Sequence, residues 1–126
     1  MKIGEFSKRS GIPITTLRYY DQIGVLQARR EGKNRVYSKK DLEKAVVIIF
    51  LQDLNFELLE IKELLQLDEL MEKNKEGKIP PEVIDRGSEL LKEKKVELQE
   101  KLEGLKEAIA YLEHILEKIN FLREGD

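Results

Sequence analysis

A short segment near the N-terminus, residues 11–20, gathers the side chains of this chain that are best suited to molecular recognition. It reads Gly-Ile-Pro-Ile-Thr-Thr-Leu-Arg-Tyr-Tyr, and we expect the turn formed by Gly11 and Pro13 to open a short helix. That helix would carry hydroxyl groups, a guanidinium group and aromatic rings from Thr15, Thr16, Arg18, Tyr19 and Tyr20. Such groups on one helix can read base edges in a DNA major groove. The segment therefore predicts the recognition helix of a helix-turn-helix.

Arg18 and the tyrosine pair each allow more than one role on this helix. Arg18 could pair with both acceptors of a guanine or bind a phosphate, and only the guanine contact carries sequence information. Tyr19 and Tyr20 are neighbours, so their side chains point about 100° apart on a helix. We expect one ring to pack inward and the other to hydrogen-bond a phosphate. Packing of both rings in the core is the alternative.

The following segment, residues 27–37, has the composition of a two-stranded wing. Gly32 and Asn34 favour a turn, while Val36 and Tyr37 favour extended strands. Only Glu31 opposes the four cations of this hairpin, which are Arg29, Arg30, Lys33 and Arg35. A charged edge that resists aggregation is one interpretation. Beside a recognition helix, we favour contacts with the DNA backbone and minor groove, each of which would steepen the salt dependence of binding.

The charge of the chain is divided unevenly between its two parts. Residues 1–44 hold 11 Lys and Arg against 5 Asp and Glu, whereas residues 45–126 hold 12 against 20. The formal net charge of −2 therefore conceals a basic N-terminal part and an acidic remainder. This division indicates that the N-terminal part meets a polyanion, with chance clustering as the alternative.

Apolar residues around the recognition segment predict the small core that would hold it. Two short helices around Gly11 would bury a shared apolar face formed by Ile3, Phe6, Ile12, Ile14 and Leu17. Gly24 can end the second helix in the left-handed conformation. Ser38 and Asp41 form a capping-box pattern that starts a further helix, which we expect to stop near Asn55. An amphipathic helix over residues 56–65 is expected to follow.

A heptad pattern dominates the C-terminal third of the chain. It follows a charged, proline-containing linker over residues 66–81, and Lys95 interrupts its seam once. The eight apolar seam residues, which we predict to form a dimer interface, are Leu91, Leu98, Leu102, Leu105, Ile109, Leu112, Leu116 and Ile119. The first 65 residues are too few to cover this stripe, so a partner chain is expected. Ala108, Ile115 and Leu122 widen the stripe, and we interpret that widening as a contact with the partner's N-terminal part.

Composition argues against catalysis and against membrane insertion. The chain has no Cys, and its single His, His114, lies among glutamates at an outer heptad position. Neither an activated nucleophile nor a closed metal shell can be assembled from these residues. The longest apolar run, residues 45–51, is too short to cross a bilayer, and the N-terminus does not resemble a signal peptide. We therefore expect a soluble cytoplasmic protein that is not an enzyme and has no metal or cofactor.

Four motifs occur within residues 1–65 in a recognisable order. They are Lys2-Ile3-Gly4-Glu5-Phe6-Ser7, Thr16-Leu17-Arg18-Tyr19-Tyr20-Asp21, Asn34-Arg35-Val36-Tyr37-Ser38 and Glu60-Ile61-Lys62-Glu63-Leu64-Leu65. In these motifs the chain resembles the MerR family of bacterial transcription regulators. The resemblance implies a mainly α fold, with a winged helix-turn-helix domain followed by a long antiparallel coiled-coil dimerisation helix. It further implies a homodimer that binds a palindromic promoter element and bends and untwists the DNA for RNA polymerase.

The resemblance also assigns residues to the DNA contact. The second helix would contribute Thr15, Thr16, Arg18, Tyr19 and Tyr20, and the wing would contribute Arg30, Lys33, Asn34, Arg35 and Tyr37. Lys62, in the helix pair that serves as a second wing, is a weaker candidate. The resulting division of the chain is a DNA-binding domain over 1–66, a linker over 67–81, a dimerisation helix over 82–122 and a tail over 123–126.

Departures from the family pattern leave the effector open. The usual Gly-Tyr before the wing arginine is Lys33-Asn34, Asn55 replaces a glycine, and Glu57 stands where a capping Ser or Thr is common. The chain lacks the cysteines of the metal sensors and the large ligand domain of the multidrug sensors. A small-molecule effector could bind where the loop 66–81 meets the base of the coiled coil, in an apolar pocket lined by Tyr111, Phe121 and Leu122, with plain dimer packing as the alternative. The competing functions are an architectural coiled-coil protein anchored to DNA and a regulator controlled only by its own abundance.

Overall fold

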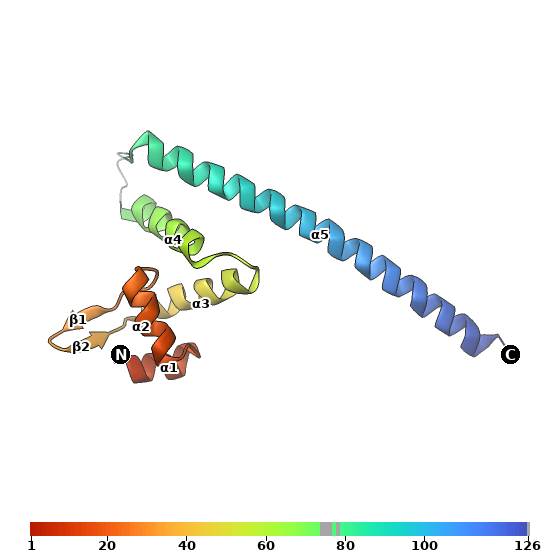
Figure 1. Ribbon diagram of the computed structural model, residues 1–126, viewed down its shortest axis with the longest axis horizontal. Coiled ribbons are helices and arrows are strands. Elements are labelled where there is room, and N and C mark those ends of the chain that lie inside the picture. Colours follow the sequence, from red (N-terminus) through yellow and green to blue (C-terminus); the bar gives the residue numbers. More distant parts are fainter. Residues whose placement is uncertain (74–76, 78, 126) are drawn as a thin grey trace. The chain divides into compact units, whose positions relative to one another are not determined.

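The computed structural model describes residues 1–73, 77 and 79–125, and Figure 1 shows its helices and strands in chain order. By its contacts the chain divides into two units, Met1–Ile79 and Pro80–Asp126. Among these described residues, the first unit holds four helices and a two-stranded sheet, and the second is one long helix. The predicted fold class, mainly α with a winged helix-turn-helix and a long C-terminal helix, is confirmed.

The first two helices, α1 (Ile3–Ser10) and α2 (Ile14–Ile23), form the helix-turn-helix. Gly11 ends α1 with a φ of 77°, a left-handed conformation that costs glycine little. Its N–H donates to Ser7 O at 2.9 Å, and the Ser7 hydroxyl donates to Ile12 O at 2.6 Å. These bonds fix the angle at which α2 leaves α1, so the turn has the structure that its glycine predicts.

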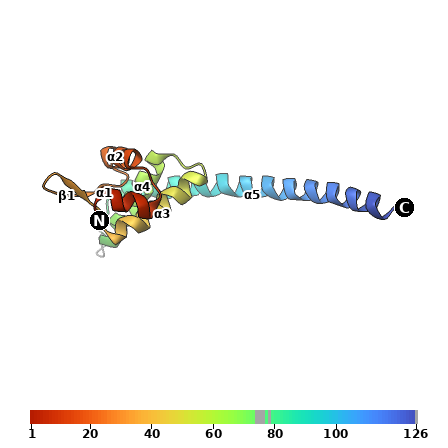
Figure 2. The same ribbon diagram turned by 90° about the horizontal axis from the view of Figure 1, so that it is seen from below.

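A hairpin of β1 (Arg29–Glu31) and β2 (Asn34–Val36) forms the wing, and it projects from the helices in both views (Figures 1 and 2). The strands are antiparallel and place Arg30 opposite Arg35. The chain before α1 is joined to the end of this wing, since Lys2 pairs with Val36 and Met1 O accepts from Tyr37 N at 2.7 Å. The predicted wing over residues 27–37 is therefore present.

Helices α3 (Lys39–Asp53) and α4 (Leu58–Lys73) complete the first unit; α3 packs against both α1 and α4. The predicted capping box starts α3: the Ser38 hydroxyl accepts from Asp41 N at 3.2 Å, and the Asp41 carboxylate accepts from Ser38 N at 2.8 Å. Asn55 has a φ of 66°, so it takes the left-handed conformation expected of the residue that replaces a glycine.

Helix α4 extends further along the chain than the sequence predicted, so the linker begins later than expected. The helix expected over 56–65 begins at Leu58 and continues to Lys73, so residues 67–73 are helical instead of forming a loop. The charged residues that indicated a loop are also good helix formers. Glu69 and Lys73 pair one turn apart at 2.8 Å, which lowers the pKa of the Glu69 carboxyl. Residues 74–76 and 78 of the predicted linker lie outside the described part of the chain.

The core of the first unit lies where the wing meets the helices. Phe6 and Tyr37 stack with ring centroids 4.2 Å apart and planes 12° from parallel. Around them the buried apolar side chains are Ile12, Leu17, Tyr20, Val25, Leu26, Ala45, Ile48, Phe56 and Ile61. Ile14, which was expected on this inward face, is instead 36% exposed. The recognition helix is thus held from α1, α3 and the wing together.

The second unit is α5 (Pro81–Glu124), a helix of 44 residues. At 1.5 Å per residue it is about 66 Å long. It contains the whole segment predicted as the dimerisation helix, and Pro81 occupies its first turn, where a missing N–H is tolerated. Seven of the eight predicted seam residues are between 41% and 62% exposed, and Leu98 is half-buried. The apolar stripe is therefore largely uncovered in a single chain.

We predict that Ser38→Ala lowers the free energy of unfolding by about 1 kcal/mol, because the N–H of Asp41 loses its capping acceptor. Urea unfolding followed by circular dichroism measures the change. Lys39→Ala is the matched control, since it alters an exposed residue at the same helix start and keeps both capping bonds. Equal unfolding midpoints for the two variants would show that the capping box contributes nothing.

Candidate nucleic-acid interface

The recognition helix α2 separates its side chains by face. Leu17 and Tyr20 are buried in the core, whereas Thr15, Arg18 and Tyr19 are exposed. Thr16 is partly buried at the border between the two faces. The helix therefore offers a hydroxyl, a guanidinium group and one aromatic ring to a ligand, as its sequence predicts.

A carboxylate on α2 joins the recognition helix to the wing. Asp21 Oδ2 accepts from Arg35 Nε on β2 at 2.8 Å, and Arg30 Nη2 on β1 lies 3.7 Å from the same oxygen. The Asp21 and Arg35 side chains are only 13% and 25% exposed. Since charge-assisted hydrogen bonds are stronger than neutral ones, this pair fixes the inner edge of the wing against α2.

An open groove of ≈ 610 Å³ lies between α2 and the wing. Its lining residues come from the end of α2, the segment after it and both strands: Arg18, Asp21, Gln22, Gln27, Ala28, Arg30 and Arg35. Three guanidinium groups thus face one carboxylate. In the described ranges 1–73, 77 and 79–125, Arg18 has no ion pair, so its guanidinium group is available to a phosphate or a base.

The wing tip carries the remaining predicted contacts. Lys33 and Asn34 are exposed, and Gly32 turns the tip with a φ of 63°. Arg29 pairs with Glu31 on the same strand at 2.9 Å, where both side chains are well exposed. The tip is therefore a solvated cationic loop, whereas the inner edge of the wing is held to α2.

Two of the residues predicted to contact DNA are buried in this structure. Tyr20 is 4% exposed, and its hydroxyl donates to Gln52 Oε1 on α3 at 2.8 Å. Tyr37 is 1% exposed and stacks on Phe6. These rings are core residues and not part of the exposed surface, because α3 and α1 pack against the sides of α2 and the wing on which they lie. Of the tyrosine pair, Tyr19 is the surface residue.

Burial also changes the acidity of the two core tyrosines. It raises the pKa of Tyr20 above the ordinary 10.0, against a smaller opposite effect of the Gln52 hydrogen bond. It raises the pKa of Tyr37 in the same way, and the negative charge of Asp21 adds to that rise. The Tyr37 hydroxyl is buried, and no hydrogen-bond partner for it is found in the described part of the chain. Both phenols are therefore harder to ionise than an exposed tyrosine.

Lys62 lies at the end of the recognition helix. Gly24 ends α2 with a φ of 82°, and a Cβ added there would meet Lys62 Nζ at 3.2 Å and Gln27 Nε2 at 3.8 Å. The Lys62 ammonium is thus placed beside the C-terminal end of α2, where the helix dipole favours a cation. It lies near Gln27, one of the groove residues, so α4 reaches the edge of the groove through this side chain.

Sequence reasoning did not assign the groove residues Asp21, Gln22, Gln27 and Ala28. One signal was present for Asp21: it follows Arg18 by three residues and so shares a helix face with it. Its bond to Arg35 spans 14 residues and depends on how the wing folds back. No local pattern reveals such a contact.

A family model described as "MerR HTH family regulatory protein" matches residues 1–68, which include the whole helix-turn-helix and wing. The chain belongs to the MerR family. The HTH-type transcriptional regulator YfmP of Bacillus subtilis is 35% identical over 105 residues, which cover 81% of this chain and 72% of that one. The ZntR homolog of Haemophilus influenzae is 35% identical over 111 residues, covering 80% and 82%.

A solved MerR family regulator from Listeria monocytogenes has the same fold. Its TM-score is 0.71 at 22% identity, and the match covers 92% of this chain and 83% of that one. The family match and the two bacterial relatives identify this MerR protein as a DNA-binding transcription regulator. In residues 1–73, 77 and 79–125 no group of three His, Asp or Glu could hold a metal ion. No helix in those ranges is both long and apolar enough to span a membrane.

We predict that Tyr20 ionises only above pH 10 in the folded protein, because burial disfavours the phenolate. A raised pKa stabilises the fold below the unfolded value of about 10, and that contribution is lost as pH rises through the folded pKa. Absorbance of phenolate near 295 nm measures the titration, and Tyr20→Phe identifies the signal that belongs to this residue. A Tyr20 difference titration centred at or below 10 would contradict the burial.

Proposed function

We propose that this MerR protein binds a palindromic promoter element as a homodimer and alters transcription by distorting that DNA for RNA polymerase. The observation that carries the proposal is the groove in which Arg18, Arg30 and Arg35 converge between the recognition helix and the wing. A helix with exposed Thr15, Arg18 and Tyr19 fits the major groove, and a cationic hairpin beside it fits the adjacent backbone. The two contacts supply base reading and phosphate binding respectively.

The exposed seam of α5 supports a homodimer. Its leucines and isoleucines recur at coiled-coil spacing, and burying each one against a partner would contribute about 1.5–3 kcal/mol. An antiparallel pairing is our proposal for the two α5 helices. A second apolar surface on α3, with Val46 66% and Phe50 60% exposed, supports an additional contact with the widened end of the partner's α5.

A rigid dimer gives a physical reason for DNA distortion. The pairing fixes the distance between two recognition helices, whereas the spacing of promoter half-sites is fixed by the DNA sequence. Where the two do not match, the DNA bends or untwists, and the protein contacts repay the deformation energy. RNA polymerase would then meet promoter elements in a changed orientation. This step is what would convert binding into regulation.

The remaining parts of the proposal follow from the same surfaces. The protein would act in the cytoplasm on the nucleoid, without a cofactor and without catalysis. An effector pocket near Tyr111, Phe121 and Leu122 stays a prediction, because its expected other wall falls partly on residues 74–76 and 78, outside the described chain. An architectural protein on DNA is the alternative, and a footprint on one short palindrome distinguishes the regulator from broad coating.

We predict that Arg18→Ala lowers affinity for a selected duplex by about 1–3 kcal/mol if Arg18 reads a base, with little change on scrambled DNA. The duplex is chosen from a random library with the wild-type protein, and binding is measured by fluorescence anisotropy. Arg9→Ala, on the exposed Arg9–Glu5 pair of α1, removes the same charge away from the groove. Equal losses on both duplexes would make Arg18 a phosphate contact.

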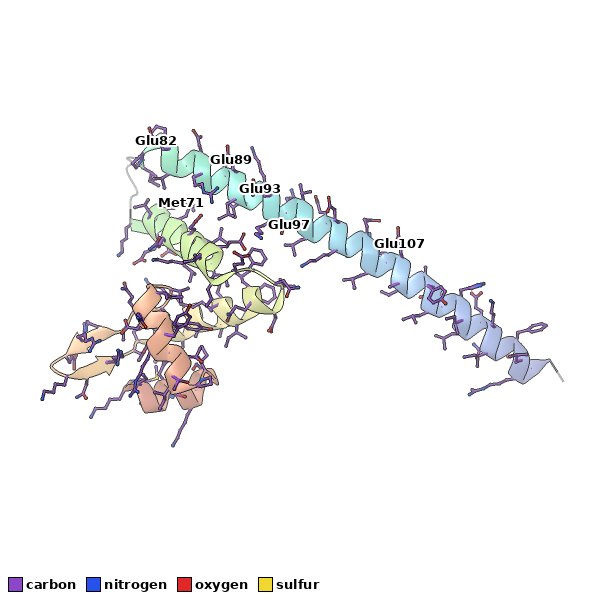
Figure 3. The ribbon with its side chains drawn as sticks, viewed as in Figure 1. Met71, Glu82, Glu89, Glu93, Glu97 and Glu107 are labelled. Atoms are coloured by element: carbon purple, nitrogen blue, oxygen red, sulfur yellow. The ribbon has the colours of Figure 1, made fainter. Side chains whose placement is uncertain are left out.

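We predict that Leu105→Lys dissociates the homodimer, because it places a charge in the apolar seam of α5. Analytical ultracentrifugation measures the mass in solution. Glu107→Lys is the matched control: Glu107, labelled on α5 in Figure 3, is exposed and takes the outermost heptad position two residues away. An undisturbed dimer for Leu105→Lys would refute the heptad register, and dissociation by Glu107→Lys would do the same.

A further inference from the structure

Asp21 occupies an unfavourable place for a carboxylate on two counts. It lies in the last turn of α2, which contains no basic residue and where the helix dipole disfavours a negative charge; the cation placed beside that end of the helix is Lys62 of α4. It also lines the groove in which a polyanion is proposed to bind. The first effect destabilises the end of α2, and the second weakens the binding of a polyanion. A favourable contact made by the carboxylate would have to offset both.

The contacts of Asp21 show what it does. A single oxygen, Oδ2, receives Arg35 Nε at 2.8 Å and lies 3.7 Å from Arg30 Nη2. Arg30 and Arg35 face each other across the hairpin, one on each strand. One atom on the recognition helix therefore hydrogen-bonds β2 through Arg35 and lies within ion-pair distance of Arg30 on β1, and the small exposed fraction of Asp21 protects the Arg35 bond from solvent.

The bond leaves the guanidinium groups usable. Arg35 donates to Asp21 through Nε, which leaves the N–H groups on the far edge of its guanidinium group able to donate to another acceptor. A long side chain that is already ordered loses less conformational entropy when it binds a phosphate. The wing arginines are thus presented in one orientation relative to α2, which fixes the register between base contacts and backbone contacts.

The same carboxylate limits attraction to DNA of any sequence. Its charge cancels one of the three guanidinium charges around the groove. Nonspecific affinity rises with the number of phosphates that are neutralised, and specific affinity depends in addition on correct orientation. A group that orders two arginines while removing one net charge therefore favours the correct sequence over all others.

We propose that Asp21 is a positioning residue that sets the ratio of specific to nonspecific DNA affinity by holding Arg35 and Arg30 against the recognition helix. The inference rests on the proposed function. Asp21 acts through the wing arginines and contacts no base itself. It raises specificity by lowering the affinity for wrong sequences as well as by ordering the contacts with the right one.

The test compares Asp21→Asn with the wild-type protein on two duplexes, one selected from a random library and one scrambled. Asp21→Asn keeps the size of the side chain and removes its charge. We expect tighter binding to the scrambled duplex and a slope of log K against log salt that is steeper by about one unit. The ratio of specific to nonspecific affinity should fall by about 10-fold. Thermal unfolding by circular dichroism verifies that the variant is folded.

Glu31→Gln is the matched charge control. Glu31 pairs only with Arg29 on its own strand among the pairs described, so its loss removes a wing carboxylate without releasing the wing from α2. It should steepen the salt slope by a similar amount and tighten binding to both duplexes alike. If the ratio of specific to nonspecific affinity falls equally in Glu31→Gln and Asp21→Asn, then Asp21 acts only through its negative charge, and the inference is overturned.

A double-mutant cycle that combines Asp21→Asn with Arg35→Gln tests whether the two residues act together on the ratio of specific to nonspecific affinity. If Asp21 acts through Arg35, then Asp21→Asn should change the affinity ratio little once Arg35 is replaced. Full additivity would overturn the inference while leaving the proposed function intact. A wild-type protein that selects no sequence from the library would instead overturn the proposed function, and the inference with it.

Discussion

The stacked rings of Phe6 and Tyr37 are the contact on which the first unit depends. One ring belongs to α1 and the other ends the wing, so their packing decides where the hairpin leaves the helical body. The backbone bond between Met1 and Tyr37 strengthens the same junction. Only with the wing anchored there can Arg35 reach back to Asp21 on α2. The packing of the core therefore determines the arrangement of the groove side chains that we propose to contact DNA.

The long helix α5 is subject to a different constraint, because much of its apolar face is exposed in a single chain. A stripe of leucine and isoleucine along α5 is open to water in one chain, and most of the stability of such a helix comes from burying its apolar face. Helix α2 is therefore proposed to contact DNA, and α5 is proposed to pair with a second chain. In the proposed dimer, the pairing of the α5 helices sets the distance between the two α2 helices.

Local patterns predicted most elements because the responsible interactions are local. Gly11 and Gly24 end helices in left-handed conformations, and Ser38 with Asp41 forms its capping box within one turn. The predicted end of the helix over 56–65 was wrong. The charged residues after it were interpreted as a linker, although the spacing of Glu69 and Lys73 also supports a helix. The burial of Tyr20 and Tyr37 and the role of Asp21 depend on contacts with distant elements. Those contacts are set by packing, and neither residue type nor spacing determines them.

The different burial of neighbouring tyrosines has an experimental consequence. The chain has no tryptophan, so its intrinsic ultraviolet emission comes from four tyrosines. Tyr19 is half-exposed on the recognition helix, whereas Tyr20 and Tyr37 are enclosed in the core. A nucleobase or phosphate that approaches the helix alters the emission of Tyr19 first. The protein thus carries its own optical probe at the surface that we propose to contact DNA, and no label has to be attached there.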